Sequence, residues 1–179
     1  AGADGLNFYI GTSEQSRHFN HGKELEEIIT NSTKIIEEVR RNYPHLTLRF
    51  SGEDAFRTRP EDLFHVYDAV APCVDRFGTP DTVGVAMPPS VAKRVQSLRE
   101  RYPNVDLEGH FHDDRGFSLY NALEAVRSGM RFMDTTLLGI AERSGITSMT
   151  ALLFNLYLDR EYDKVEGYNL RGSYPINVL

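Results

Sequence analysis

The sequence predicts an α/β fold built on a parallel sheet, and two features of the residue pattern indicate it. Short apolar runs alternate with amphipathic stretches about five times along the 179 residues, with no long loop between them. Polar residues also gather where several of these runs end. Strands joined by crossover helices run parallel, so these polar residues are expected to meet at one edge of the sheet.

The predicted strands are short runs that include β-branched and aromatic residues, several of which end at a glycine or a polar turn. The run at 73–78 is the least regular, because it is short and polar. The five predicted strands cover residues 6–10, 46–51, 73–78, 105–112 and 131–138.

The predicted helices show apolar residues at helical spacing with charges opposite. Two of them cover 22–41 and 88–102. Pro60 suits the first turn of another helix, because proline needs no amide hydrogen there. A further helix contains Leu119 and Val126, and Thr147 is predicted to cap the last one.

Two architectures place ligands at the carboxyl ends of parallel strands, namely the open doubly wound sheet and the eight-stranded (β/α) barrel. No G-x-G-x-x-G segment follows a predicted strand, so a dinucleotide site has no support. A complete barrel takes about 250 residues, so five units fall about three strands short of one.

Composition excludes some classes of partner. The formal net charge is −6, which repels nucleic acid and anionic membranes. No apolar run approaches the roughly 18 residues of a membrane span. Cys73 is the single cysteine, so an internal disulfide is impossible and a reducing, cytoplasmic location is expected.

The strongest chemical signal is the segment Glu108-Gly-His-Phe-His112. Residues two apart on a strand point the same way, so Glu108, His110 and His112 share one face and Phe111 lies on the other. Two imidazoles at this spacing can bind one divalent ion from the same side. The alternative is a hydrogen-bonded pair of core histidines, and we favour the metal.

A second signal is the alternation of Arg49, Ser51 and Glu53 on one strand face. An inward arginine on an otherwise apolar strand needs a partner. That partner is either a carboxylate of the chain, Glu53 or Asp54, or a substrate carboxylate held in bidentate fashion. Weaker signals are Thr82, whose hydroxyl could reach a carboxylate, and the charged loop at 142–143.

Five motifs follow one another along the chain: Gly-Thr-Ser at 11–13, Arg-Phe-Ser-Gly-Glu-Asp at 49–54, Asp-Thr-Val-Gly at 81–84, His-Phe-His-Asp-Asp at 110–114, and Asp-Thr-Thr-Leu-Leu-Gly-Ile-Ala-Glu-Arg-Ser-Gly-Ile-Thr at 134–147. Their order resembles one family, the metal-dependent barrel acyltransferases that include the homocitrate, isopropylmalate and citramalate synthases. The segment at 134–147 looks most like the homocitrate branch. This resemblance spans about residues 3–160 and implies that the five strands are strands 4–8 of a TIM barrel, here a partial barrel.

The resemblance implies a Claisen-type condensation of acetyl-CoA with a 2-oxo acid, 2-oxoglutarate being favoured, as in lysine biosynthesis. It implies that His110 and His112 hold a divalent metal (Zn, Mn, Mg or Co) that polarises the keto group. It also implies a homodimer for the full-length protein.

The same resemblance implies roles for the remaining residues. Glu108 corresponds to an acid/base or acetyl-CoA-binding carboxylate, and it is the predicted catalytic residue. The predicted substrate-binding residues are Arg49 and Ser51 at the distal carboxylate, Thr82 at the carboxylate beside the ketone, Glu142 and Arg143 in the loop that closes over the site, and Glu53.

Some positions depart from the family pattern. The family's opening strand carries an acid that completes the metal site, and this chain does not contain that strand. Asp113 stands where synthases usually have Asn and lyases have Asp. Tyr120 and Ala141 replace a small residue and a glycine. We expect the chain alone to lack synthase activity, and thiol release with 2-oxoglutarate and acetyl-CoA would contradict this.

The alternatives are an isopropylmalate, citramalate or Re-citrate synthase, a lyase similar to the hydroxymethylglutaryl-CoA lyases, and a catalytically incomplete fragment or subunit. The lyases need a cysteine in the loop after the last strand, where Cys73 does not lie. The predicted domains are a partial TIM-barrel catalytic domain at 1–160 and a linker towards a missing C-terminal subdomain at 161–179.

Overall fold

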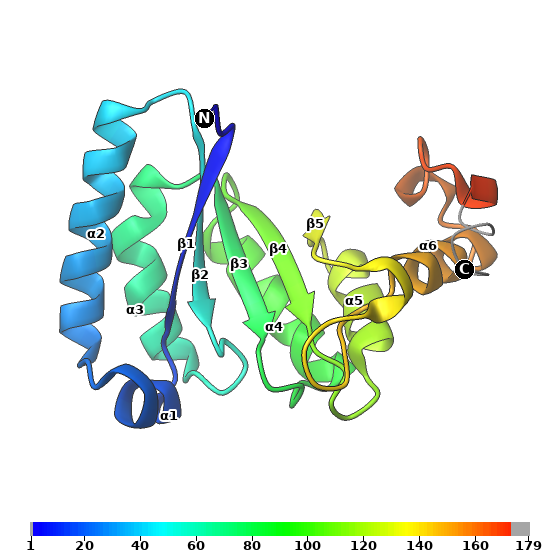
Figure 1. The fold of residues 1–179 in the computed structure, drawn as a ribbon, viewed down its shortest axis with the longest axis horizontal. Helices are drawn as coiled ribbons and strands as arrows, with labels where there is room; N and C mark the ends of the chain where they lie inside the picture. The colour runs from blue at the N-terminus through cyan, green and yellow to red at the C-terminus, as the bar shows by residue number, and fades with distance from the viewer. Residues whose placement is uncertain (1, 173–179) are drawn as a thin grey trace.

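The computed structural model describes residues 2–172, whose strands form one parallel sheet. The strands lie side by side in sequence order, and each is separated from the next by a helix (Figure 1). This arrangement confirms the predicted parallel α/β fold. The strands are β1 (Gly5–Gly11), β2 (Thr47–Glu53), β3 (Arg76–Asp81), β4 (Asp106–Phe111) and β5 (Phe132–Met133).

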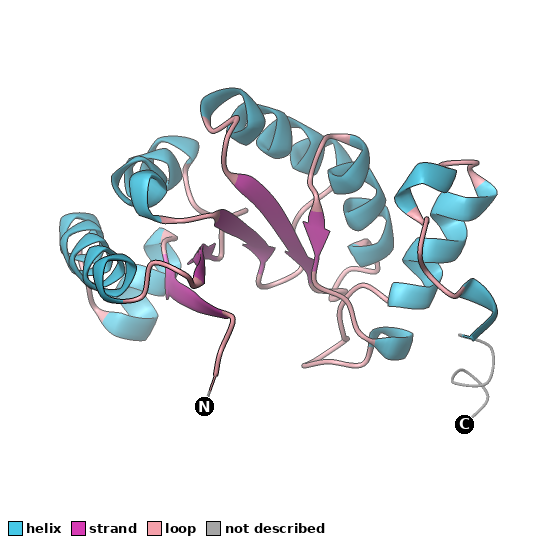
Figure 2. Ribbon diagram, turned by 90° about the horizontal axis from the view of Figure 1, so that it is seen from above, coloured by secondary structure: helices cyan, strands magenta, loops and turns pink. Residues whose placement is uncertain are grey.

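The helices form an arc along one face of the sheet (Figure 2). The longer ones are α2 (Leu25–Asn42), α3 (Pro60–Val70), α4 (Pro88–Arg101), α5 (Ser118–Arg127) and α6 (Met149–Leu158). The shorter ones are α1 (Glu14–Ser16), the π-helix η1 (Arg17–His21) and the 3₁₀ helices η2 (Ala71–Cys73), η3 (Leu137–Gly139), η4 (Tyr162–Lys164) and η5 (Leu170–Gly172). No helix within residues 2–172 has the length and apolar content needed to cross a bilayer.

Alternation along the strands separates an apolar face from a polar one. The helix-facing residues pack against the apolar stripes of the helices and form the core, whereas Arg49 and Glu108 point to the opposite face. The polar face therefore carries the predicted site. The buried helix-facing strand residues are Leu48, Phe50, Phe77, Leu107 and Phe111.

An aromatic cluster links the helix layer to the sheet beneath that polar face. Tyr67 of α3 is fully buried and stacks on Phe77, with ring centroids 4.2 Å apart, and Tyr102 packs edge-on against both rings. The Tyr67 hydroxyl donates to Gly78 O at 2.6 Å and accepts from Gly52 N–H at 3.2 Å. Burial raises the pKa of Tyr67 to about 12, so it stays protonated and can donate.

Two predicted strands differ from those observed. The strand predicted at 73–78 is β3, Arg76–Asp81, because Ala71–Cys73 forms a 3₁₀ turn. The strand predicted at 131–138 is reduced to Phe132–Met133. After Asp134 the chain turns away, and Leu138 and Gly139 have φ of 61° and 76°, a conformation that cannot continue a strand.

Helix starts also differ in detail. The helix predicted from residue 22 begins at Leu25, because Gly22 is left-handed with φ 67°. Ser148, not Thr147, caps α6 by accepting from Ala151 N–H. Thr147 donates instead to Ser118 O, which holds the segment before α6 against the start of α5.

The described part of the predicted linker packs on the domain. Val165 belongs to the core, and Glu161 pairs with Arg127 at 2.8 Å. Residues 173–179 lie outside the described part of the chain. The linker therefore stays a prediction.

Candidate active site

The predicted site residues converge on a cavity of about 250 Å³ at the carboxyl ends of the strands. Six of the nine predicted residues line it, and Glu108, Glu142 and Arg143 do not. A larger hollow of about 690 Å³ beside β5 and α6 contains none of the nine. The cavity is lined by Asn7, Tyr9, Arg49, Ser51, Glu53, Pro80, Thr82, His110, His112 and Asp134.

The two histidines meet at the end of β4. His112 lies one residue past the strand, where it bridges to Ile146, and its Nε2 is 3.1 Å from Nε2 of His110. Two nitrogens each about 2.1 Å from one ion, at right angles, would be about 3.0 Å apart. The pair therefore fits a shared divalent ion. Within residues 2–172 no cluster of three or more His, Cys, Asp or Glu could hold a metal, so the role of this pair as metal ligands stays a prediction.

The environment of His112 keeps it neutral. Burial lowers the pKa of His112, and the charges of His110 and Arg143 lower it further. The neutral ring is the form that binds metals. In addition, Nδ1 of His112 is buried with no hydrogen-bond partner in the described chain.

Arg49 is paired, although with neither of the partners weighed from the sequence, Glu53 and Asp54. Its guanidinium contacts Glu108 at 2.5 Å and Asp134 at 3.1 Å, and its Nε is buried without a described partner. Gly78 of β3 makes room for it, because a Cβ at that position would lie 2.7 Å from Arg49 Nε. The arginine is thus held on the polar face with one donor unused.

Glu108 is more enclosed than the sequence indicates. Its side chain is 6% exposed and lies between Arg49 and Arg76, which contacts it at 2.7 Å. Burial raises the pKa of Glu108, and nearby Asp134 acts in the same direction. Both carboxylate oxygens face arginines here, so in this arrangement Glu108 anchors them. Its predicted catalytic role stays a prediction.

Asp134 is the residue of this cluster that the sequence prediction missed. Its Oδ2 lies 3.2 Å from Nδ1 of His110 and 3.1 Å from Nη2 of Arg49. Burial opposes ionisation, but the hydrogen bond from His110 and the charge of Arg49 hold the pKa of Asp134 below its usual range. Its position two residues after Phe132 on the predicted fifth strand is the signal that could have found it. Asn7, which accepts from Ser51 Oγ at 3.3 Å, carries the same alternation signal on the first strand.

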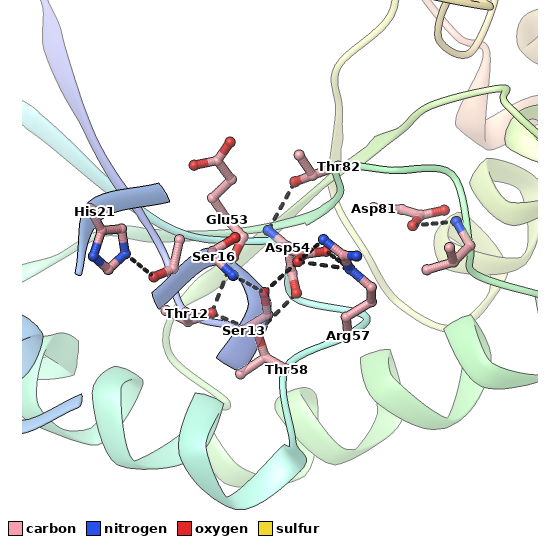
Figure 3. A network of polar contacts seen from close by, with 12 residues as sticks. Thr12, Ser13, Ser16, His21, Glu53, Asp54, Arg57, Thr58, Asp81 and Thr82 are labelled. Atoms are coloured by element: carbon pink, nitrogen blue, oxygen red, sulfur yellow. Dashed lines mark hydrogen bonds and ion pairs between the residues drawn. The ribbon is translucent and has the colours of Figure 1, made fainter. Parts of the chain in front are cut away.

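A second polar network lies beside the cavity and centres on Asp54 (Figure 3). Asp54 is 2% exposed, has φ 62°, and accepts from Ser13 Oγ and from Arg57 Nε at 2.9 Å. Its N–H donates to Thr82 Oγ1 at 2.9 Å. This bond does not use the Thr82 hydroxyl hydrogen, so Thr82 can also donate to a group in the cavity that it lines. The Glu53 side chain points away from the network (Figure 3).

The loop between β5 and α6 is fastened across the strand ends. Arg143 forks onto Asp114 at 2.7 and 2.8 Å and donates to Thr82 O at 2.7 Å. Arg143 and Glu142 are exposed and lie outside the cavity lining. Their predicted contact with substrate stays a prediction.

Curated proteins with similar sequences include homocitrate synthases and 2-isopropylmalate synthases. The chain is 42% identical to the mitochondrial homocitrate synthase of Schizosaccharomyces pombe over 99% of this chain and 41% of that protein. It is 39% identical to the cytosolic isozyme of Saccharomyces cerevisiae, over 85% of this chain and 35% of that protein. It is 34% identical to the 2-isopropylmalate synthase of Sediminispirochaeta smaragdinae, over 97% of this chain and 35% of that protein. The chain thus spans about two fifths or less of the length of these relatives.

Solved structures share the fold at low sequence identity. The hydroxymethylglutaryl-CoA lyase of Pseudomonas aeruginosa matches with a TM-score of 0.77 and 16% identity, over 96% of this chain and 60% of that one. The lyase of Brucella melitensis matches with a TM-score of 0.73 and 21% identity, over 88% and 60%. These likenesses confirm the predicted partial TIM-barrel fold. The HMGL-like family model matches residues 1–172, and the chain therefore belongs to the HMGL-like family.

Proposed function

We propose that this chain is the metal- and 2-oxo-acid-binding part of a synthase that condenses acetyl-CoA with 2-oxoglutarate to give homocitrate. The observation that carries the proposal is the cavity in which the paired His110 and His112 nitrogens face Arg49, Ser51 and Thr82. The names of the similar synthases support it. One of these relatives is mitochondrial and the other cytosolic. From the lone Cys73 we propose a reducing compartment such as the cytosol, and a homodimer of the complete protein remains part of the proposal.

Each side chain would contribute a specific function to binding. Arg49, through its unused Nε donor, and Ser51 would bind the distal carboxylate of the 2-oxo acid. The available hydroxyl hydrogen of Thr82 would bind the carboxylate beside the ketone. A divalent ion between His110 and His112 would supply Lewis-acid polarisation of the keto group.

Glu108 would have to leave one arginine before it could accept a proton from the acetyl group. A substrate carboxylate that binds Arg49 would compete for the same guanidinium and so favour this release. Substrate binding and exposure of the predicted base would then be linked.

A lyase is the second candidate, favoured by Asp113 and by the structural likeness to lyases. The position of Cys73 argues against it. This residue ends the turn before β3, at the opposite edge of the sheet from the cavity, so its thiol cannot reach the reacting groups.

The test is calorimetric titration of Zn²⁺ and Mn²⁺ into the chain and into the double variant His110→Ala/His112→Ala. We expect binding to the chain and its loss in the variant. The titration is then repeated with 2-oxoglutarate, oxaloacetate and 2-oxoisovalerate in the presence of the metal. Tightest binding of 2-oxoglutarate supports the homocitrate assignment, and a preference for 2-oxoisovalerate would replace it with isopropylmalate.

A further inference from the structure

Asp134 lies among His110, Arg49 and Glu108, and the proposed function assigns it no role. It follows β5 directly, and its N–H donates to Gly109 O at 2.8 Å, which fixes its backbone against β4. Its Oδ2 lies within hydrogen-bond distance of both Nδ1 of His110 and Nη2 of Arg49. One carboxylate oxygen therefore joins a predicted metal ligand to a predicted substrate-binding arginine.

This contact sets the tautomer of His110. An ionised carboxylate can only accept hydrogen bonds, so the ring nitrogen that faces it carries the hydrogen. With the hydrogen on Nδ1, the lone pair of Nε2 is available towards the cavity. Arg49 stabilises the ionised carboxylate from the other side.

His112 provides a contrast within the same pair. Its Nδ1 faces no carboxylate, and within residues 2–172 no hydrogen bond of normal geometry reaches that atom. The two Nε2 atoms lie 3.1 Å apart, and no carboxylate fixes the tautomer of His112 as Asp134 does that of His110.

We propose that Asp134 is a positioning residue that holds His110 in the ring orientation and tautomer required to bind a divalent cation. The inference rests on the proposed function for the presence of the cation. The tautomer itself is a property of the chain without any ion.

The experiment compares the whole chain with Asp134→Ala, Asp134→Asn and the control Asp106→Asn. Asp106 is a second aspartate of the same sheet, at the amino end of β4, and its partner Arg131 lies at 3.4 Å, away from the cavity. Long-range ¹H–¹⁵N NMR of the imidazole rings reports the tautomer. Calorimetry with Zn²⁺ reports affinity, and circular dichroism confirms that each variant is folded.

We expect His110 to carry its hydrogen on Nδ1 in the unaltered chain and to lose this preference in Asp134→Ala. Zn²⁺ affinity should fall by about 10- to 100-fold in Asp134→Ala, less in Asp134→Asn because the amide oxygen still accepts, and less than twofold in Asp106→Asn. An unchanged His110 tautomer in Asp134→Ala would overturn the inference. Absence of Zn²⁺ binding to the unaltered chain would instead defeat the proposed function, and the NMR result would still decide the role of Asp134.

Discussion

Two polar clusters lie side by side at the carboxyl edge of the sheet, and they differ in how completely their hydrogen-bonding groups are used. Around Asp54, both carboxylate oxygens, its N–H and its carbonyl all have partners. Around His110, in contrast, Arg49 Nε and His112 Nδ1 are buried without partners in the described chain. Buried polar groups are normally satisfied, so this difference supports the proposal that the histidine cluster binds a ligand, whereas the Asp54 network is structural.

The difference also explains which cluster can change state. The Asp54 network fixes the loops after β1, β2 and β3, because Ser13, Arg57 and Thr82 belong to three different strand ends. In the histidine cluster, in contrast, His110 contacts both His112 and Asp134, and Arg49 contacts both Glu108 and Asp134, so each of the two has more than one possible partner. A rigid neighbour thus supports an adaptable site.

The largest expected effect comes from breaking the satisfied network with Asp54→Ala. The change removes the hydrogen-bond acceptor of the Ser13 hydroxyl and the ion-pair partner of Arg57. It also keeps a non-glycine residue at φ 62°. We expect a loss of about 2–3 kcal/mol in the free energy of unfolding, measured by urea denaturation. The matched variant Asp54→Gly removes the same carboxylate without the backbone strain and should lose about 1 kcal/mol less. A loss below about 1 kcal/mol in Asp54→Ala would mean that the network is dispensable.

Gly78→Ala is expected to lower stability less than Asp54→Ala does, but to weaken ligand binding at the cavity. The new Cβ would lie 2.1 Å from Ser51 Oγ and 2.7 Å from Arg49 Nε, so both side chains must move. Because the contacted atoms belong to side chains and not to the backbone, stability should fall by only about 1 kcal/mol. Metal-dependent 2-oxoglutarate binding, measured by calorimetry, should weaken tenfold or more.

Gly2→Ala serves as the control for this variant, because no atom lies within 4 Å of a Cβ at that position. If Gly78→Ala bound 2-oxoglutarate as well as Gly2→Ala does, Arg49 and Ser51 would not be the carboxylate site.

The smallest effect is expected at an exposed ion pair remote from both clusters. Arg101 of α4 forks onto Asp68 of α3, and this hydrogen bond, aided by Tyr102, holds the pKa of Asp68 below its usual value. A carboxyl whose folded pKa is lowered stabilises the fold above its unfolded pKa of about 3.9, and this contribution is lost as the pH falls through the folded value.

Asp68→Asn should therefore cost less than about 1 kcal/mol at pH 7, because Asp68 is 41% exposed and the pair is screened by solvent. Denaturation curves of the variant and the unaltered chain should converge below about pH 4. A difference that persists at low pH would show that the amide disturbs packing instead of charge.

Periodicity alone was sufficient to predict most of the fold. The alternation that places Phe50 and Phe77 against the helices also places Arg49 and Ser51 on the polar face, and both placements are confirmed. The last strand could not be bounded in this way, because the left-handed turn at Leu138 depends on how the loop packs and not on apolar spacing.

The sequence could predict most of the residues that line the site, but not which of them form ion pairs and hydrogen bonds with one another. The sequence brought His110, His112, Arg49 and Thr82 together through strand alternation and resemblance. It could not show that Arg49 chooses Glu108 and Asp134 over Glu53, because strand neighbours are set by register between segments far apart in the chain. The pairing of Arg49 with Asp134 depends on the same register, whereas the alternation on the last strand could have placed Asp134 at the site.

The stacked Tyr67 and Phe77 rings allow the packing beneath the cavity to be followed by spectroscopy. The chain contains no tryptophan, so near-ultraviolet circular dichroism arises from its tyrosines and phenylalanines, and immobile stacked rings contribute most strongly. The Tyr67 hydroxyl also bonds Gly52 and Gly78, the backbone directly beside Ser51. Loss of this signal with retained helical dichroism would therefore report loosening beneath the cavity before the chain unfolds.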